Sequence, residues 1–269
     1  MLNVYSLCEL WNAVVSRFTK AQNELLRNIA APYHDDKTPE TRAFGIIPSL
    51  CPASACPWKS IQALETDMKT NHQQILNEVK VLIRRGYCGV AMADLDEVQR
   101  EAFREQQTWK IMSVKFFNQY ADTDLPTLTR ICKKHRRIIS LLHVSCMAPG
   151  TELKTHVGIT TSVLRYHYGL QIPRGPCGLV VQGTPFKWTN GEGVIWDDML
   201  PHMALNRSDE VRMVVFADLY RPGMPFVIRV GNSLIHWVAA RSNHIKSIQK
   251  RLAAGGALAG LRHHQEKDQ

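Results

Sequence analysis

The sequence predicts a mainly β protein, a sandwich or barrel, with a helical extension at its N-terminal end. Three observations support this fold class. From about Trp109 to Tyr220 the chain consists of short β-prone runs separated by Gly, Pro and Asn residues, which is typical of sandwiches and barrels. Before Gly86 the apolar residues recur at helical spacing instead. With 269 residues, 45% hydrophobic and 21% charged, the chain has the size and composition of a globular protein with a sizeable core.

Two helices are predicted before the β region. From Leu7 to Phe18 the apolar residues follow one stripe of an amphipathic helix. A second stripe runs from Leu64 to Ile83 and is followed by Gly86, the residue type favoured just after a helix. The N-terminal part of the chain is therefore expected to be helical and to pack on the β region or flank it.

The remaining segments up to residue 220 are expected to be connectors and strands. Residues 31–58 contain several prolines and predict an irregular connector, whereas residues 95–103 predict a third, short helix. The stretch "TNGEG" at 189–193 predicts a turn between two strands. The predicted strands are 109–117, 137–147, 162–172, 178–183, 186–189, 193–198 and 211–220.

After Pro225 the chain is expected to turn helical again. Polar residues, among them Arg229 and His236, interrupt any membrane-spanning run. The helix is expected to pack on the β region with an apolar stripe formed by Phe226, Val227, Val230, Leu234, Trp237 and Val238.

The predicted organisation has three parts. We expect a helical N-terminal region at 1–106, a β domain at 107–224 and a basic, partly helical tail at 225–269. No internal repeat is evident.

The net charge of +9 is concentrated in two places. Residues 221–269 carry eight basic side chains and two acidic ones, and "RICKKHRR" at 130–137 forms a second basic cluster. Such clusters attract anions of any kind, whether nucleic acid, lipid headgroups or acidic peptides. We expect an acidic partner, which is a peptide, a protein or a lipid. Peripheral membrane contact through the tail is a further possibility, and nucleic acid is not expected.

The N-terminus and the cysteines favour an intracellular protein. The first residues do not have the pattern of a secretory signal peptide, and no segment is long and apolar enough to span a membrane. Seven scattered cysteines indicate reduced thiols more than a disulfide framework. Cys51 and Cys56 bracket a short loop and could pair or bind metal, but separate thiols are favoured. The expected location is the cytoplasm.

Strand alternation identifies candidate ligand-binding side chains. In the run 162–172 it puts Arg165 and His167 on the same face. If that face is buried, the arginine needs an anionic partner, and a carboxylate ligand would supply one. Arg212 shares a face with Val214 and Phe216 and is a candidate carboxylate clamp. An edge-strand arginine that reaches solvent is equally compatible with this second pattern.

Two histidines are candidate metal ligands. His156 follows a turn that leads into a strand, and His202 follows a predicted strand. Imidazoles from two strands suit iron, zinc or copper. Non-heme iron oxygenases usually add a carboxylate two residues after the first histidine, but Gly158 occupies that position. Asp197 and Asp198 are expected to cap a turn, with orientation of His202 as the alternative.

Four stretches together are far more specific. "SCMAPGTELKTHVG", "LRYHYGLQIP", "GEGVIWDDMLPHMALN" and "RMVVFADLYRP" resemble, in order and spacing, the aspartyl/asparaginyl β-hydroxylase family. Members of this family are iron(II)- and 2-oxoglutarate-dependent oxygenases on a double-stranded β-helix, also described as a jelly-roll or cupin-like fold. The resemblance covers somewhat under half of the chain and implies a dioxygenase that uses Fe(2+), 2-oxoglutarate and O2.

The resemblance also implies roles for individual residues. The family holds iron with two histidines and has glycine in place of the carboxylate, so it accounts for Gly158. By resemblance, the metal ligands and catalytic residues are His156 and His202. The residues implied to bind 2-oxoglutarate are Ser145, Arg165, His167 and Arg212, of which Arg212 pairs with the distal carboxylate.

Family precedent slightly favours hydroxylation of the β-carbon of Asp or Asn side chains in a peptide or protein. The alternative within the family is hydroxylation of a lipid acyl chain at a membrane surface. A third hypothesis, from a different class, is a metal-binding β-helix that serves as an interaction module without turnover.

Overall fold

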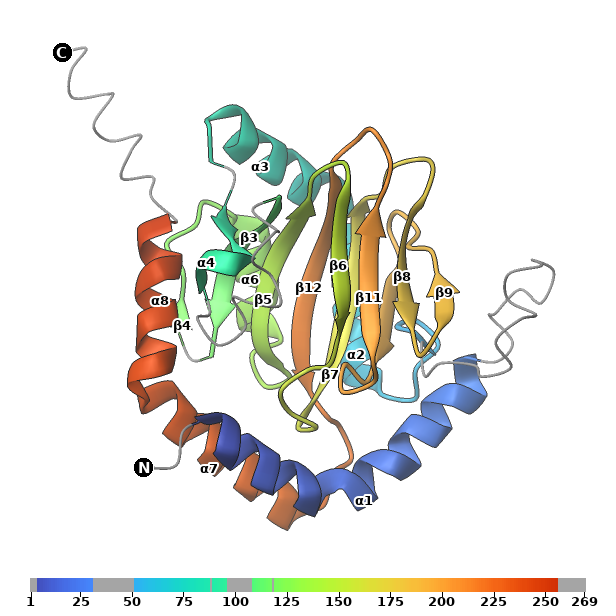
Figure 1. The fold of residues 1–269 in the computed structure, drawn as a ribbon, viewed down its shortest axis with the longest axis vertical. Coiled ribbons are helices and arrows are strands. Elements are labelled where there is room, and N and C mark those ends of the chain that lie inside the picture. The colour runs from blue at the N-terminus through green and yellow to red at the C-terminus, as the bar shows by residue number, and fades with distance from the viewer. Residues whose placement is uncertain (1–3, 31–50, 88, 96–107, 118, 256–269) are drawn as a thin grey trace.

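Two antiparallel sheets form the centre of the molecule (Figure 1). The computed structural model describes residues 4–30, 51–87, 89–95, 108–117 and 119–255. The larger sheet has the strand order β1-β10-β7-β12-β5-β3-β2, with β4 paired to β3, and the smaller has the order β6-β11-β8-β9. Every pairing between these strands is antiparallel. This is the predicted double-stranded β-helix, a cupin-like jelly-roll with added helices.

The strands of the larger sheet are β1 Cys51–Pro52, β2 Val90–Ala91, β3 Trp109–Phe116, β4 Gln119–Tyr120, β5 Ile139–Met147, β7 Val163–Gln171, β10 Gly193–Trp196 and β12 Arg212–Tyr220. The strands of the smaller sheet are β6 Thr151–His156, β8 Cys177–Val181, β9 Thr184–Phe186 and β11 His202–Asn206. The helices are α1 Val4–Ala30, α2 Lys59–Thr70, α3 His72–Arg84, α4 Met92–Leu95, α6 Pro126–Lys134, α7 Phe226–Arg241 and α8 Asn243–Gly255.

The side chains of β7 point to two opposite faces of the larger sheet, as predicted from strand alternation. Tyr166 and Tyr168 belong to a core between the larger sheet and the helices α2, α3 and α6. Val214 and Phe216 of the neighbouring strand β12 belong to the second core, which lies between the two sheets. Because residues of one strand alternate between faces, polar side chains on this second face point toward the space between the sheets.

The C-terminal helices complete the core between the sheets. Ala239 of α7 and Ile245, Ile248 and Leu252 of α8 are buried in it. Helix α1 crosses α7 along the lower edge of the molecule in Figure 1. The core between the sheets is thus completed by helices that follow the strands in sequence.

Most predicted elements agree with the structure, and the differences have local causes. The predicted second helix is two helices that meet at Asn71, whose side-chain amide donates to the carbonyl of Asp67 (2.7 Å) and so caps α2. Strand β9 ends at Phe186, so the prediction for 186–189 was displaced. Strands β6 and β11 were not predicted because their short runs mix polar and apolar residues. The helix predicted at 95–103 lies almost wholly outside the described residues.

Cys51 and Cys56 are separate buried thiols. Burial raises the pKa of Cys51 to about 12, which keeps it protonated and unreactive. Among the described residues, no helix has the length and hydrophobicity that crossing a membrane requires.

Candidate active site

Two histidines face each other across a pair of strands in the smaller sheet. His202 on β11 is the register partner of His156 on β6, and their ring centroids are 4.3 Å apart. The Nδ1 of His156 donates to the carbonyl of Lys154 (2.8 Å), and the Nδ1 of His202 donates to the carbonyl of Leu200 (2.9 Å). A carbonyl only accepts, so the proton of each ring is on Nδ1. Each Nε2 then carries a lone pair, which is the form that binds a metal.

The surroundings also keep both imidazoles neutral. Burial lowers the pKa of His156 and lowers that of His202 to about 3, with the neighbouring ring as a further cause at His202. A neutral imidazole is the ligating form of histidine. The pair is therefore electronically suited to a divalent metal of the iron or zinc type.

There is no room at position 158 for a side chain that could serve as a third metal ligand. A Cβ at this position would lie 2.4 Å from the Cγ of Asp198, and the Gly158 amide donates to the Asp198 carbonyl (2.7 Å). In the described part of the chain, no three His, Cys, Asp or Glu side chains are grouped so that they could hold a metal ion. The donor set is two imidazoles, with the remaining positions of a metal open to small molecules.

Arg212 is a buried cation with no carboxylate partner among the described residues. Its side chain is 2% exposed, and neither Nε nor Nη1 has a hydrogen-bond partner within the described part of the chain. One nitrogen, Nη2, is 3.5 Å from the Oγ of Ser145, and the guanidinium lies over the ring of Trp188 at 4.8 Å. Burial lowers the pKa of Arg212 to about 10, so it stays charged at neutral pH. A buried guanidinium with two unsatisfied nitrogens is a site for an anion that accepts two parallel hydrogen bonds, such as a carboxylate.

His167 lies between the histidine pair and Arg212. Its ring contacts Trp196 (4.6 Å between centroids) and Trp188 (5.8 Å). Trp196 also contacts His202, and Trp188 contacts Arg212. Burial, followed by the charges of nearby Arg165 and Arg212, holds the pKa of His167 well below its usual value. The structure therefore connects four predicted site residues, His156, His202, His167 and Arg212, through side-chain ring contacts. Ser145 adjoins Arg212 and accepts a hydrogen bond from Trp109 (2.9 Å).

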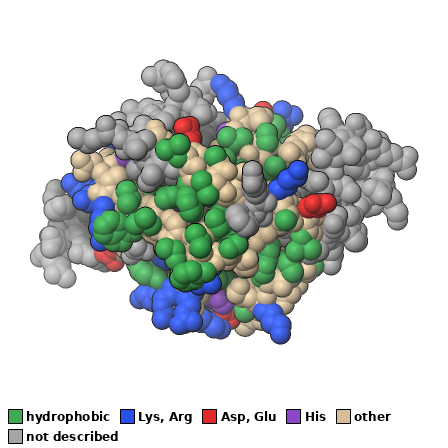
Figure 2. Space-filling view, turned by 90° about the horizontal axis from the view of Figure 1, so that it is seen from below, with side chains coloured by type: hydrophobic (Ala, Val, Ile, Leu, Met, Phe, Trp, Pro, Cys, Tyr) green, Lys and Arg blue, Asp and Glu red, His purple; other side chains and the backbone are tan. Residues whose placement is uncertain are grey.

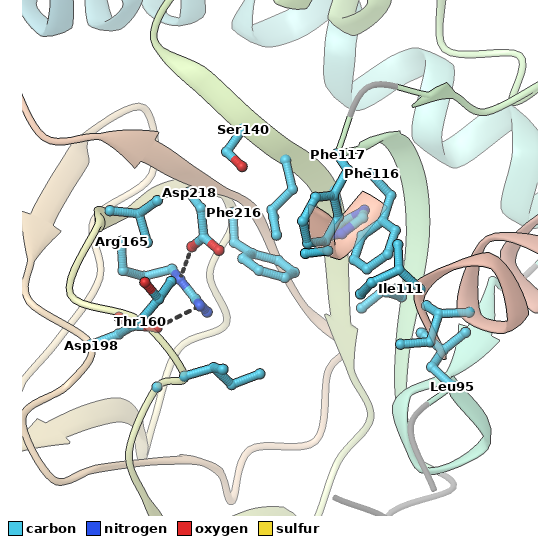
Figure 3. Close-up of a pocket in the computed structure, with 18 of the residues that line it drawn as sticks. Leu95, Ile111, Phe116, Phe117, Ser140, Thr160, Arg165, Asp198, Phe216 and Asp218 are labelled. Carbon is cyan, nitrogen blue, oxygen red and sulfur yellow. Dashed lines mark hydrogen bonds and ion pairs between the residues drawn. The ribbon is translucent and has the colours of Figure 1, made fainter. Parts of the chain in front are cut away.

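Arg165 already has two protein carboxylates as partners. Its Nε donates to Asp218 (2.6 Å), its Nη2 donates to Asp198 (2.7 Å), and its guanidinium lies over the ring of Phe216 (Figure 3). The anionic ligand inferred from its burial is thus not needed to neutralise it. The expectation that Asp198 caps a turn was wrong, since its carboxylate pairs with Arg165, whereas Asp197 accepts from the amide of Met199 as such a cap does. Burial raises the pKa of Asp198 to about 7, and Arg165 opposes the shift.

A cavity of about 210 Å³ extends from the histidine pair to the C-terminal helices. Its polar end is lined by His156, His202 and the Arg165 cluster with its two carboxylates. Figure 3 shows this cluster on one side of Phe216 and a group of apolar side chains, which includes Phe116, Phe117, Ile111 and Leu95, on the other. Further apolar residues of α7 and α8 line the same end, namely Ile235, Ala239, Ile245, Ile248 and Leu252. The cavity thus has a polar end at the histidine pair and a mostly apolar end at the C-terminal helices.

Sequence reasoning missed several residues of this site. Asp218 shares the face of Arg212 by alternation along the same strand, so that signal was present in the sequence. His143 likewise shares the face of Ser145, and it lines the cavity. Trp188 fell in the strand predicted at 186–189 but lies outside the observed strands, and it reaches Arg212 only through the tertiary fold.

The buried histidines predict an acid-sensitive fold. Burial lowers the pKa of His143 from 6.5 to about 3, with Arg165 as a lesser cause. The stabilising contribution of the neutral ring is fully present above pH 6.5 and is lost as the pH falls toward 3. We expect His143 alone to lower the free energy of unfolding by about 2 kcal/mol between about pH 7 and about pH 5. Denaturant titrations at the two pH values measure this.

The matched control for that titration is His143→Gln, which keeps a polar side chain but does not titrate. The acid-induced loss of stability should be smaller in the variant by about 2 kcal/mol. An equal loss in both proteins would show that His143 is not held neutral by the fold.

Part of the chain, from the end of α2 to just after β12, is similar to known proteins. Residues 69–222 match the family described as aspartyl/asparaginyl beta-hydroxylase. The chain is 31% identical over 139 residues to aspartate beta-hydroxylase domain-containing protein 2 of Xenopus tropicalis, covering 44% of this chain and 37% of that one. It is 35% identical over 80 residues to the ornithine lipid ester-linked acyl 2-hydroxylase of Rhizobium tropici, covering 29% and 28%. It is 32% identical over 78 residues to the human aspartyl/asparaginyl beta-hydroxylase, covering 29% and 10%. The chain therefore covers 37% or less of the length of each of these curated relatives.

Proposed function

The chain belongs to the aspartyl/asparaginyl β-hydroxylase family, and from this premise we propose that it is an iron(II)- and 2-oxoglutarate-dependent dioxygenase that hydroxylates a lipid acyl chain. The observation that carries the choice of substrate is the apolar cavity that leads from the histidine pair to the C-terminal helices. The proposal keeps the reaction class expected from the resemblance and changes the preferred substrate.

The side chains fit an iron ion. His156 and His202 would hold it through Nε2, since both Nδ1 protons are donated to backbone carbonyls. Those hydrogen bonds orient each ring, which is a common way to fix metal-binding histidines. Bound iron, together with 2-oxoglutarate and O2, supplies the oxidising power that converts a C–H bond to C–OH while the cosubstrate becomes succinate and CO2.

The side chains also fit 2-oxoglutarate. Arg212 would take the distal carboxylate, because its guanidinium is buried with two unsatisfied nitrogens in the described chain. Ser145, which adjoins Arg212, and His167, whose ring contacts Trp188, would contact the same molecule. For Arg165 we propose a positioning role in addition to the implied contact. It holds Asp198 over Gly158 and Asp218 beside Phe216, and so shapes the wall next to the histidines.

The lining of the cavity favours an acyl chain over an aspartyl side chain. At the polar end one guanidinium faces two carboxylates, those of Asp198 and Asp218. A further carboxylate from an aspartyl substrate would meet no uncompensated cation there. The rest of the wall is mostly apolar, from Ile111 on the sheet to Leu252 on α8, with His236 and His244 as polar residues on the two helices. Burial of methylene groups against the apolar side chains is favourable. The name of the Rhizobium tropici relative describes an acyl 2-hydroxylase, which supports the same choice.

The test is a turnover assay with two substrate classes. Purified protein is incubated with iron(II), 2-oxoglutarate and air. One set of reactions contains lipids, either extracted phospholipids or ornithine lipids, and the other contains acidic peptides with Asp and Asn. We expect succinate formation to be stimulated by lipid, and a gain of one oxygen atom on the acyl chain by mass spectrometry. A gain of oxygen only on Asp or Asn would instead establish the peptide hydroxylase expected from the resemblance.

A binding measurement separates these outcomes from a protein without turnover. Under anaerobic conditions, iron(II) with 2-oxoglutarate should produce a weak charge-transfer absorption in the visible range. The absence of this band, together with the absence of succinate in air, would refute the dioxygenase proposal and favour a metal-binding interaction module.

A further inference from the structure

Helix α7 is apolar on two opposite sides. Its inner side carries Ile228, Ile235 and Ala239, which contact the helix α1 region and the cavity. Its outer side is exposed to solvent, with Val227 at 73% and Phe226 at 72%. We call this outer side the α7 outer face; it consists of Phe226, Val227, Val230, Leu234, Trp237 and Val238. The expectation that this stripe packs on the β domain was wrong, because a different stripe of the same helix makes the contact.

Helix α1 extends the α7 outer face. The ring of Trp11 lies against Gly231, where a Cβ would come within 2.0 Å of the ring, and its Nε1 donates to Asn232 (2.5 Å). Two apolar residues near Trp11 on α1, Leu10 and Val14, are 62% and 54% exposed. Figure 2 shows hydrophobic side chains gathered over the side of the molecule where α1 and α7 lie. A monomer rarely leaves so large an apolar surface in water without a partner.

The charges on α7 and α8 are of one sign, whereas α1 carries an exposed acidic residue, Glu9, beside Leu10. Residues 226–255, which form α7 and α8, contain no Asp or Glu. Arg229, Arg241, Lys246 and Lys250 are all exposed, and Lys and Arg side chains border the apolar region along one edge in Figure 2. The guanidinium of Arg241 lies 3.9 Å from the ring centre of Trp237. Apolar and aromatic side chains bordered by basic ones are the pattern of helices that lie in the interface of an anionic bilayer.

The same surface adjoins the mouth of the cavity. Val157 and Ile159 line the cavity, yet they are 49% and 39% exposed. The loop that carries them is held by Asn12 of α1, which donates to the carbonyl of Ile159 (3.0 Å) and accepts from the amide of Thr161 (2.9 Å). On α7, Ile235 lines the cavity and its neighbour Leu234 belongs to the outer face. One helix therefore separates the cavity from the exposed apolar surface.

We propose that α1 and α7 dock the protein on an anionic phospholipid bilayer, with the α7 outer face, Leu10 and Val14 immersed in the interface and the basic side chains on the headgroups. The helices lie in the plane of the interface, since none of the described helices is suited to span a bilayer. Docking brings the cavity mouth to the depth at which acyl chains begin. The binding itself follows from the surface alone, while its purpose, delivery of an acyl chain, rests on the proposed function.

The experiment is co-sedimentation of the full chain with vesicles, without iron or 2-oxoglutarate. Vesicles of phosphatidylcholine alone are compared with vesicles of equal parts phosphatidylcholine and phosphatidylglycerol. We expect binding to the anionic vesicles that weakens as salt is added. The double variant Val230→Glu with Leu234→Glu should lower the partition coefficient by about tenfold or more, because it places two charges in the immersed surface.

The matched control is Val211→Glu, which adds a charge at an apolar position that is 36% exposed and lies outside α1 and α7. It should bind vesicles as the unmodified chain does. Lys246→Gln with Lys250→Gln should weaken binding to anionic vesicles and reduce its salt dependence. Thermal melts confirm that each variant is folded, and Val227→Glu replaces the double variant if that one is not.

Two results would overturn the proposal. One is equal vesicle binding by the Val230→Glu, Leu234→Glu protein and its parent. The other is the absence of vesicle binding in a parent that forms a dimer by sedimentation velocity, with the dimer lost in the double variant; the surface would then contact a second copy of the chain. Vesicle binding without lipid hydroxylation refutes the proposed substrate but supports the docking surface. Hydroxylation of detergent-dispersed lipid without vesicle binding supports the proposed substrate but refutes the docking surface.

Discussion

Replacement of His202 by alanine is expected to abolish iron binding and 2-oxoglutarate turnover. His156 and His202 offer a metal two imidazoles, and no third His, Cys, Asp or Glu side chain is grouped with them among the described residues. Loss of one of the two histidines therefore leaves a single protein ligand. Removal of a mere supporting partner of a ligand typically costs 10- to 100-fold in affinity or activity, and loss of the ligand itself should cost about a hundredfold or more. His156→Ala is expected to have the same effect.

Iron affinity is the decisive measurement, because it does not depend on the substrate. Anaerobic equilibrium dialysis with iron(II) compares His202→Ala and His156→Ala with His143→Gln. His143 lines the same cavity but lies on β5 of the opposite sheet, so its variant should keep iron affinity within a few-fold. Unchanged iron binding by His202→Ala would mean that the metal is held by residues other than this histidine pair.

Replacement of Arg212 by methionine is expected to raise the 2-oxoglutarate requirement strongly and to leave iron binding in place. Loss of one member of a buried, hydrogen-bonded charge pair costs about 3 kcal/mol, which corresponds to about a hundredfold in affinity. The 2-oxoglutarate affinity of Arg212→Lys should lie between those of the unmodified protein and Arg212→Met, since an ammonium keeps the charge but cannot form two parallel hydrogen bonds. The measurement is the KM for 2-oxoglutarate together with the thermal shift that 2-oxoglutarate produces with iron(II) in the absence of oxygen.

Stability distinguishes Arg212 from a structural arginine. In the ligand-free protein Arg212 is a cation without a carboxylate partner in the described chain, so methionine should preserve or raise the melting temperature. Arg165→Met is the contrasting variant, because it leaves Asp198 and Asp218 buried without their counterion and should destabilise the fold. A normal KM in Arg212→Met would refute the assignment of this guanidinium to the cosubstrate.

The structure gives a physical reason for the absence of a carboxylate at position 158, which the motif alone does not. The sequence indicates only that glycine replaces the usual ligand. In the fold, the carboxylate of Asp198 fills the space that a side chain at 158 would need, and Arg165 holds it there. Two acidic residues, Asp198 and Asp218, thus belong to the wall of the cavity.

The sequence by itself determined which side chains share a face. Alternation along β7 and β12 follows directly from the period of two of an extended chain, so the common face of Arg165 and His167, and that of Arg212 and Phe216, could be inferred from residue order. The family and the double-stranded β-helix followed from the order and spacing of four stretches, and the residues matched to the family confirm the former. The shared faces depend on local backbone geometry alone, whereas the family and its fold rest on the resemblance.

Only the tertiary structure decided what lies opposite each face. The partners of Arg165 come from β12 and from the turn after β10, at sequence separations of 53 and 33 residues, and no periodicity encodes such a meeting. Helix α7 shows the same limit, since both of its apolar stripes have helical spacing and only contact with α1 and the cavity selects the buried one. The physical reason is that periodicity reports how a segment presents its own side chains, whereas ion pairs, cavity walls and exposed faces depend on where other segments come to rest against it.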